Sequence, residues 1–214
     1  MSVFFSIFSH DGRWLVGAGN ARKLRVWSAV TGRKIGTLGG HENEITKLVL
    51  SPDGRYLASI GNDDVVKLWD GTRLDQPQAG PRQFPGLCGG FTDLLAFSPD
   101  SRRLAIVASD DLARIHRLDE PAEPLDLLAP GHRPLALAFS PDGRWIASGG
   151  VDCTIRVWDA VTGRQRDTLR SHVEQVTRLR FLSRPEGAWL VSGSRDGTVK
   201  FWDLSGVQEI DSRP

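Results

Sequence analysis

A turn-forming pentapeptide recurs along the chain, and this repeat constrains the fold more strongly than any other feature of the sequence. Its copies start at Ser9, Ser51, Ser98 and Ser140, at intervals of 42, 47 and 42 residues, and three of them begin Ser-Pro-Asp. A weaker fifth copy is Arg184-Pro-Glu-Gly187. Self-similarity at such a period is typical of proteins in which one small structural unit stacks on the next. The sequence therefore predicts five units.

Tryptophan marks the same units a second time. The segments Arg25-Val-Trp27, Lys67-Leu-Trp-Asp70, Arg156-Val-Trp-Asp159 and Lys200-Phe-Trp-Asp203 place their tryptophans 42, 89 and 44 residues apart. Because 89 residues equal one 42-residue and one 47-residue repeat, one unit has lost its tryptophan. When Leu104 is aligned with Leu57, His116 stands at the position of Trp69.

Each unit divides into short strands separated by turns. Proline presets the first central residue of a type I turn and glycine suits its end, so Ser-Pro-Asp-Gly predicts a turn. Runs of strand length precede and follow it, as in Ile45–Leu50 and Tyr56–Ser59. A small-residue turn, a β-branched strand such as Thr154–Asp159 and a weaker strand such as Gln165–Leu169 complete the unit. The pattern predicts four antiparallel strands per repeat.

Four short strands cannot bury both faces of their sheet, so successive sheets must stack on one another. Radial stacking around an axis gives a propeller. We therefore predict an all-β fold, a β-propeller of about five four-stranded antiparallel blades that is either complete or part of a larger propeller. In this interpretation residues 1–214 form one domain, with blades over residues 1–39, 40–86, 87–130, 131–170 and 171–214.

The fourth unit shows a family resemblance most completely. Its Gly131-His132 pair, Ser-Pro-Asp-Gly turn and Trp158-Asp159 pair resemble the WD-repeat (WD40) β-propeller family, whose repeats run about 40 to 45 residues. The resemblance covers essentially the whole chain. It implies a buried hydrogen-bond network in each blade, between a His before the first strand, a Ser on the second, an Asp in the next turn and the Trp. The matching residues are His41, Ser59, Asp63 and Trp69; His132, Ser148, Asp152 and Trp158; and His172, Ser192, Asp196 and Trp202.

The same residue types could form a Ser-His-Asp catalytic triad. Three copies at equivalent, separated positions are redundant for catalysis, each Ser is predicted in mid-strand, and no G-x-S-x-G motif occurs. Gly17–Arg22 resembles a dinucleotide-binding loop over three residues only. The histidines lie in different blades, and Cys88 and Cys153 have no second ligand nearby in the sequence. We therefore predict no catalytic residue, cofactor or metal site, and interpret the networks as structural.

Two units depart from the family pattern. Blade 1 has Gly17 and Ala21 at the positions of the Ser and the Asp, so we expect no network there. Blade 3 keeps only the Asp of its set, and we interpret the histidine at its Trp position as a decayed Trp site rather than a ligand. Its four residues are Cys88, Ile106, Asp110 and His116.

Composition and charge argue against several classes of function. The 27 Lys and Arg residues nearly balance the 26 Asp and Glu, and a net charge of +1 provides no global field to hold a nucleic acid or an anionic membrane. The two cysteines have no disulfide-framework spacing, which fits a reducing compartment. The apolar stretch Val3–Phe8 is too short for a membrane span and has no basic residues before it. We expect a soluble cytoplasmic protein without nucleic-acid or membrane partners.

The predicted fold and the lack of an exposed catalytic set favour a non-catalytic protein–protein interaction scaffold. One alternative is a propeller module or fragment of a larger signalling protein, for example one linked to a kinase. Another is an enzyme that uses the central channel. If the five blades close into a ring we expect a monomer; if they do not, exposed blade faces should produce oligomers.

The resemblance implies that partners bind the surface carrying the loops before each first strand and the turns after each second strand. Acidic residues in blades 2 and 3 and basic residues in blades 4 and 5 favour a partner of mixed charge, with Phe91 as the best aromatic anchor. Thr72–Gly90, with three prolines, is predicted to form an irregular outer strand and loop, and such loops often carry recognition. The candidate partner-binding residues are Glu42, Glu44, Thr46, Asn62, Asp64, Phe91, Asp93, Ser109, Arg133, Gln175 and Arg195.

Overall fold

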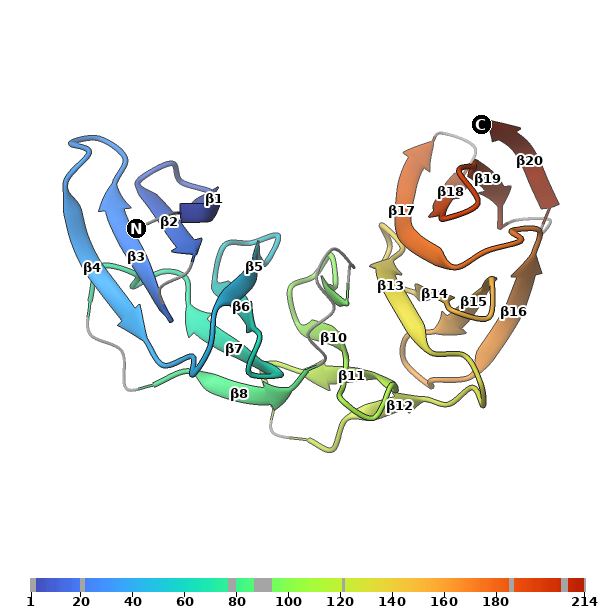
Figure 1. Ribbon diagram of the computed structural model, residues 1–214, viewed down its shortest axis with the longest axis horizontal. Coiled ribbons are helices and arrows are strands. Elements are labelled where there is room, and N and C mark those ends of the chain that lie inside the picture. Colours follow the sequence, from blue (N-terminus) through green and yellow to red (C-terminus); the bar gives the residue numbers. More distant parts are fainter. Residues whose placement is uncertain are drawn as a thin grey trace. The chain divides into compact units, whose positions relative to one another are not determined.

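The computed structural model describes residues 3–19, 22–76, 80–86, 94–120, 122–184, 187–204 and 208–213. Over these ranges the chain forms strands joined by turns, and it contains no helix. The strands pair into five four-stranded sheets, which we number blades 1 to 5 in chain order (Figure 1). The predicted all-β fold of four-stranded antiparallel blades is confirmed.

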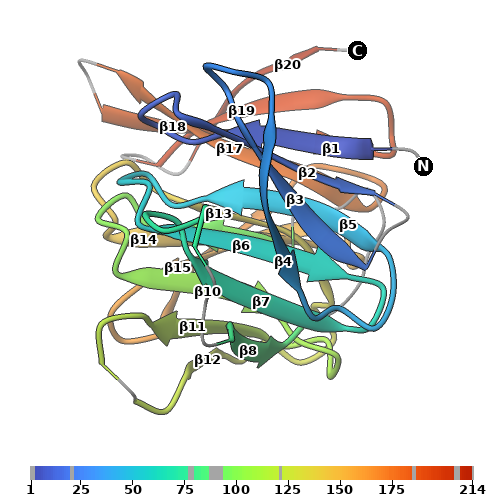
Figure 2. The same ribbon diagram turned by 90° about the vertical axis from the view of Figure 1, so that its left-hand side faces the viewer.

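Within every blade the strands are hydrogen-bonded in chain order, as Figure 2 shows most clearly for blade 2. The strands are β1 (Val3–Phe8), β2 (Trp14–Gly19), β3 (Lys23–Ser28) and β4 (Lys34–Gly39) in blade 1; β5 (Ile45–Leu50), β6 (Tyr56–Gly61), β7 (Val65–Asp70) and β8 (Arg82–Pro85) in blade 2; β9 (Leu95–Phe97), β10 (Arg103–Val107), β11 (Ala113–Arg117) and β12 (Leu125–Leu127) in blade 3; β13 (Pro134–Phe139), β14 (Trp145–Gly150), β15 (Thr154–Asp159) and β16 (Gln165–Arg170) in blade 4; and β17 (Val176–Arg184), β18 (Gly187–Ser194), β19 (Val199–Asp203) and β20 (Gln208–Arg213) in blade 5.

The chain divides into two compact units, Met1–Gly90 with blades 1 and 2 and Phe91–Pro214 with blades 3 to 5. In the first unit, Val16 and Val26 of blade 1 share a core with Leu57 and Trp69 of blade 2. In the second unit, a core of the same kind joins blades 4 and 5. Sheets therefore stack on neighbouring sheets within each unit, and the single domain over residues 1–214 with its predicted blade limits stays a prediction.

The repeated pentapeptide forms the hairpin turn between the first two strands of a blade. In blade 2 the Ser51 hydroxyl donates to Asp53 at 2.7 Å and accepts the backbone N–H of Tyr56 at 2.9 Å. Asp53 also accepts the backbone N–H of Arg55, and Gly54 takes the left-handed conformation with a φ of 73°. The Ser and the Asp thus satisfy backbone donors that the turn leaves outside the sheet, which explains why the same residues recur.

The register between the second and third strands is the same in all five blades. Leu57 lies opposite Trp69 in blade 2, as Ile146 lies opposite Trp158 in blade 4. In blade 3, Leu104 lies opposite His116. The predicted alignment, in which histidine stands at the lost Trp position, is confirmed.

Close approach between blades 4 and 5 depends on a glycine. A Cβ added to Gly149 of β14 would lie 2.6 Å from the Cγ1 and 2.9 Å from the Cβ of Val176, which begins β17. No side chain fits at these distances. The equivalent Gly193 of blade 5 meets nothing closer than 3.5 Å, so the requirement is specific to the contact between these two blades.

The proline-containing segment after β7 carries only a short outer strand of blade 2. β8 spans four residues and pairs with Val65–Leu68, which leaves the last two residues of β7 beyond its end. This agrees with the irregular outer strand predicted over Thr72–Gly90, of which residues 77–79 and 87–90 lie outside the described residues.

Candidate functional site

The four residues predicted to form the blade 2 network are linked by hydrogen bonds in the order Asp63, His41, Ser59, Trp69. His41 precedes β5, Ser59 lies within β6, Asp63 sits in the turn after β6, and Trp69 belongs to β7. The His41 Nδ1 lies 2.9 Å from an Asp63 oxygen, and its Nε2 lies 2.8 Å from Ser59 Oγ. The Trp69 indole N–H donates to the same Oγ at 2.9 Å. The network therefore joins the loop before β5 to the second and third strands of the blade and to the turn between them.

Blades 4 and 5 repeat this geometry. In blade 4, His132 lies 2.9 Å from Asp152 and 2.8 Å from Ser148, which accepts the Trp158 N–H at 2.9 Å. The blade 5 residues, at the same separations, are His172, Ser192, Asp196 and Trp202. All twelve residues singled out in the sequence are thus brought together in three separate sets of four.

The direction of the hydrogen bonds follows from the chemistry of the groups. An indole N–H can only donate, so Ser59 Oγ accepts from Trp69 and turns its own proton toward His41 Nε2. The remaining imidazole proton then resides on Nδ1 and is donated to the Asp63 carboxylate. A neutral histidine in this tautomer gives each polar side chain of the network a hydrogen-bond partner.

Burial and hydrogen bonding set the charge states of the histidine and the aspartate in the network. Burial lowers the pKa of His41 below its ordinary value of 6.5, against the opposing effect of Asp63, and the same holds for the pKa of His132. For Asp63, burial alone would raise the pKa, but the hydrogen bonds from His41 and from the Glu42 backbone N–H outweigh it and lower the pKa. The set is therefore a neutral histidine on a carboxylate at neutral pH.

The lowered histidine pKa predicts a loss of stability in mild acid. Because the folded protein binds fewer protons than the unfolded chain, the contribution of His41 and His132 is fully present above pH 6.5 and is lost as the pH falls. We expect the melting temperature to decrease between about pH 7 and about pH 5. The double variant His41→Gln, His132→Gln should start lower and lose part of this dependence. An unchanged pH dependence in that variant would show that these histidines do not cause it.

The networks leave their serines unavailable for nucleophilic attack. Ser59 and Ser148 are fully buried and Ser192 is 1% exposed, and each Oγ is engaged by both a His and a Trp. A catalytic nucleophile must reach its substrate. Within the described ranges, no group of three or more His, Cys, Asp or Glu side chains is arranged to hold a metal ion. Across the same part of the chain, no helix is long and apolar enough to span a membrane.

Most of the candidate partner-binding residues lie at the loop ends beside these networks. In the first unit, Glu42, Glu44, Asn62 and Asp64 are exposed, while Thr46 is half-buried. The backbone N–H of Asn62 donates to the Glu44 carbonyl at 2.7 Å, so the two loops are adjacent. These residues form an acidic surface at the end of blade 2.

In the second unit, Ser109, Arg133 and Arg195 are exposed and Gln175 is half-buried. Arg133 is paired with Asp111 of the neighbouring blade, with a nitrogen–oxygen distance of 2.8 Å. Arg195 donates its backbone N–H to Gln175 at 3.0 Å. The candidates Phe91 and Asp93 lie outside the described residues, and so does Cys88 of the decayed blade 3 set.

Blade 3 contains an arginine with two carboxylate partners that the sequence reasoning did not single out. Arg114 of β11 donates two hydrogen bonds to Asp110, at 2.8 and 2.5 Å, and a third to Asp126 of β12 at 2.9 Å. The signal for it was present, because a Lys or Arg stands two residues before the Trp position in every repeat. These residues are Arg25, Lys67, Arg114, Arg156 and Lys200.

Comparison with known families agrees with this geometry. The model of the WD40 family, described as WD domain, G-beta repeat, matches residues 32–70, 124–159 and 163–203, more than half of the chain. Together with the four-stranded blades and their His-Ser-Asp-Trp sets, this shows that the chain belongs to the WD40 repeat family. Repeats of this family suggest a protein-interaction scaffold.

Similar proteins share single repeats with the chain. Notchless protein homolog of Arabidopsis thaliana is 44% identical over 45 residues, which are 20% of this chain and 10% of that protein. Ribosome biogenesis protein erb1 of Aspergillus fumigatus is 57% identical over 37 residues, 16% of this chain and 5% of that protein. U3 snoRNP-associated protein-like EMB2271 of Arabidopsis thaliana is 45% identical over 47 residues, which are 22% of this chain and 10% of that protein. The matched regions thus cover a tenth or less of the length of these relatives.

Proposed function

We propose that this chain is a non-catalytic scaffold that binds a protein partner through the loop ends beside its His-Ser-Asp-Trp sets. One observation carries the proposal: the residues capable of catalysis are buried and bonded to one another, whereas their sequence neighbours are exposed. His41 is 5% exposed next to exposed Glu42, and His172 is 7% exposed next to Val173, which is 81% exposed. The buried residues stabilise the blades, and the exposed residues remain accessible to a partner.

The loop ends of the two units carry charges of different sign. The first unit presents Glu42 and Glu44, whereas the second presents Arg133 and Arg195. Such a distribution suits a protein better than a uniform polyanion. Two of the relatives are named for ribosome biogenesis and U3 snoRNP association. We infer that this chain contacts a protein directly, even if that protein is part of a ribonucleoprotein assembly.

Charge reversal at the loop ends tests this proposal. We expect Glu44→Lys in the first unit and Arg195→Glu in the second to reduce the recovery of partner proteins captured from a lysate of the source cell, measured by quantitative mass spectrometry. Charged side chains at an interface mainly set association rate and specificity, so the melting temperature should stay unchanged.

Exposed arginines at the opposite ends of the sheets supply the matched control. Arg33 follows the turn between β3 and β4, and Arg164 follows the turn between β15 and β16. Arg33→Glu and Arg164→Glu should leave capture intact. If these variants lost partners while Glu44→Lys and Arg195→Glu retained them, the binding surface would lie at the other end of the blades.

A further inference from the structure

The stacked blades of both units use the same two faces. Leu57 and Trp69 are cross-strand partners on one face of blade 2, and they share a core with Val16 and Val26, cross-strand partners in blade 1. The corresponding core of the second unit contains Leu190, Trp202, Ala147 and Val157. We name the two surfaces the Trp face and the Val face. In both cases the Trp face of one blade packs on the Val face of the blade before it.

The Trp face of blade 1 is open to solvent. Blade 2 packs on the opposite face, so Phe8, Leu15 and Trp27 are left without a covering sheet in the first unit. Phe8 is 59% exposed, and Leu15 and Trp27 are partly exposed. The residues at the same positions of other blades are at most 9% exposed: Phe97, Phe139, Phe181, Leu57, Leu104, Ile146, Leu190, Trp69, Trp158 and Trp202.

This open face contains a groove of about 430 Å³, lined mainly by apolar surface. Phe8, Leu15 and Trp27 lie around it, together with Ser6 and Gly17. Gly17 stands where blades 2, 4 and 5 have a serine. Ser6 stands at the position of a leucine in the same three blades, namely Leu48, Leu137 and Leu179. Two small residues therefore leave a hollow that the other blades fill with their own side chains.

Blade 5 leaves a face of the other kind open. Val199 of its Val face is 39% exposed, and Val191 and Phe201 are partly exposed. The equivalent residues of blades 1 to 4 are at most 4% exposed: Val16, Leu24, Val26, Ala58, Val66, Leu68, Ala105, Ala113, Ile115, Ala147, Ile155 and Val157. The second unit therefore ends in an apolar face that lacks the Trp face of a following blade.

The two open faces depart from the other blades in a complementary way. Phe201 is the bulkiest residue at its position, where the other blades have Val26, Leu68, Ile115 and Val157. In the first unit, Val26 shares its core with Trp69 and Leu48 of the following blade. The same stacking would place Phe201 beside Trp27 and Ser6. The largest side chain of one open face thus matches the hollow of the other.

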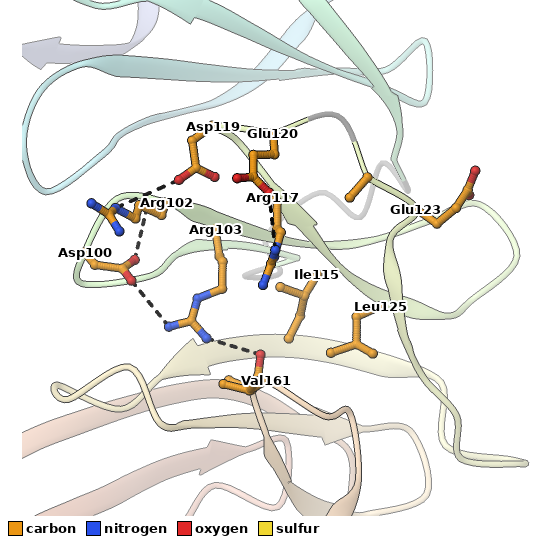
Figure 3. Close-up of a pocket in the computed structure, with 12 residues that line it drawn as sticks. Asp100, Arg102, Arg103, Ile115, Arg117, Asp119, Glu120, Glu123, Leu125 and Val161 are labelled. Atoms are coloured by element: carbon orange, nitrogen blue, oxygen red, sulfur yellow. Dashed lines mark hydrogen bonds and ion pairs between the residues drawn. The ribbon is translucent and has the colours of Figure 1, made fainter.

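The groove where blades 3 and 4 meet offers no comparable surface. Arg103 of β10 lies opposite Arg117 of β11, and both side chains line this groove. Figure 3 shows that each has an acidic partner in the chain, Asp100 at 3.6 Å from Arg103 and Glu120 at 3.5 Å from Arg117. Its charges are paired within the second unit, whereas the groove of blade 1 exposes apolar surface that only burial removes from water.

We propose that the chain self-associates head to tail, with the Val face of blade 5 in one copy packed on the Trp face of blade 1 in the next. A second copy supplies the face that each open face lacks, and the contact repeats the one within each unit. Phe201 enters the hollow beside Gly17 and buries Phe8 and Trp27. The contact is separate from the loop-end surface and does not rest on the proposed function.

Analytical ultracentrifugation of the full chain over a range of concentrations tests the association. We expect dimers and larger species as the concentration rises, because a head-to-tail contact leaves one open face at each end. Phe8→Glu and Val199→Glu each place a carboxylate in the contact at an exposed position, so each variant should fold and remain monomeric. A wild-type chain that is monomeric at every concentration would overturn the proposal.

A mixture of the two glutamate variants tests which faces meet. The Phe8→Glu chain keeps an intact blade 5 face, and the Val199→Glu chain keeps an intact blade 1 face. One contact can therefore form between them, and we expect the mixture to give a dimer but no larger species. A mixture that stays monomeric would contradict the head-to-tail arrangement.

Two further variants complete the test. Val161→Glu changes a valine that is 70% exposed in the turn after β15, on neither face, and should associate as the wild type does. Phe201→Val introduces the residue of blades 1 and 4, so it keeps the face apolar if a glutamate variant failed to fold. It should raise the dissociation constant about tenfold, because it removes the side chain that fills the hollow. Full association of Phe201→Val, or its loss in Val161→Glu, would overturn the proposal.

Discussion

Replacement of Trp158 by alanine is expected to lower the free energy of unfolding by about 3–5 kcal/mol. The side chain is 1% exposed in the core of blade 4, and its indole N–H donates to Ser148 Oγ at 2.9 Å. The truncation removes this packing and deprives the buried Ser148 of a donor. Thermal or denaturant unfolding followed by circular dichroism measures the loss.

Trp27 provides the matched control for this prediction. It occupies the same register position in blade 1, opposite Leu15, but it is only partly buried. The serine of blades 2, 4 and 5 is replaced by Gly17, which removes the hydroxyl acceptor. Trp27→Ala should therefore cost distinctly less than Trp158→Ala. Equal losses in the two variants would show that burial and the bond to serine do not set the contribution of the tryptophan.

Replacement of His172 by alanine is expected to cost about 1–3 kcal/mol. The imidazole lies 2.9 Å from Asp196 and 2.8 Å from Ser192, and its ring meets the edge of Trp202 at a centroid distance of 6.4 Å. Without it, two buried polar side chains lose a partner. Asp196 keeps its bonds from Thr198 and from the Val173 backbone, which limits the damage.

The neighbouring Val173 supplies the control for His172. Its side chain is 81% exposed, so Val173→Ala should change the free energy of unfolding by less than about 0.5 kcal/mol. Calorimetry of the two variants under one set of conditions separates the network from the loop that carries it. A His172→Ala protein as stable as the Val173→Ala protein would mean that the network contributes nothing measurable.

Much of the fold could be predicted because its turns carry their own chemistry. The Ser-Pro-Asp-Gly turn fixes where two strands meet, as the bonds of Ser51 and Asp53 show. Once those positions repeat, the register of each hairpin follows, and His116 falls opposite Leu104 as the alignment required. The His-Ser-Asp-Trp contacts could be placed because the same spacing occurs in three blades.

Other features depend on contacts that spacing does not reveal. Arg114 bridges Asp110 and Asp126. Asp110 lies in the turn before β11, whereas Asp126 lies in β12. The opposition of Arg103 and Arg117 emerges only when the strand register is known. These features belong to the unit that departs most from the repeat, where the pattern shared by the other blades gives no guidance.

The most direct test of the account measures stability and partner capture side by side in His172→Ala and Arg195→Glu, at a temperature below the melting point of both. The account predicts that His172→Ala melts earlier but captures partners as the wild-type chain does. It predicts that Arg195→Glu melts like the wild type but captures less. A His172→Ala protein with unchanged melting temperature that has lost binding or a catalytic activity would contradict the claim that these buried sets are structural.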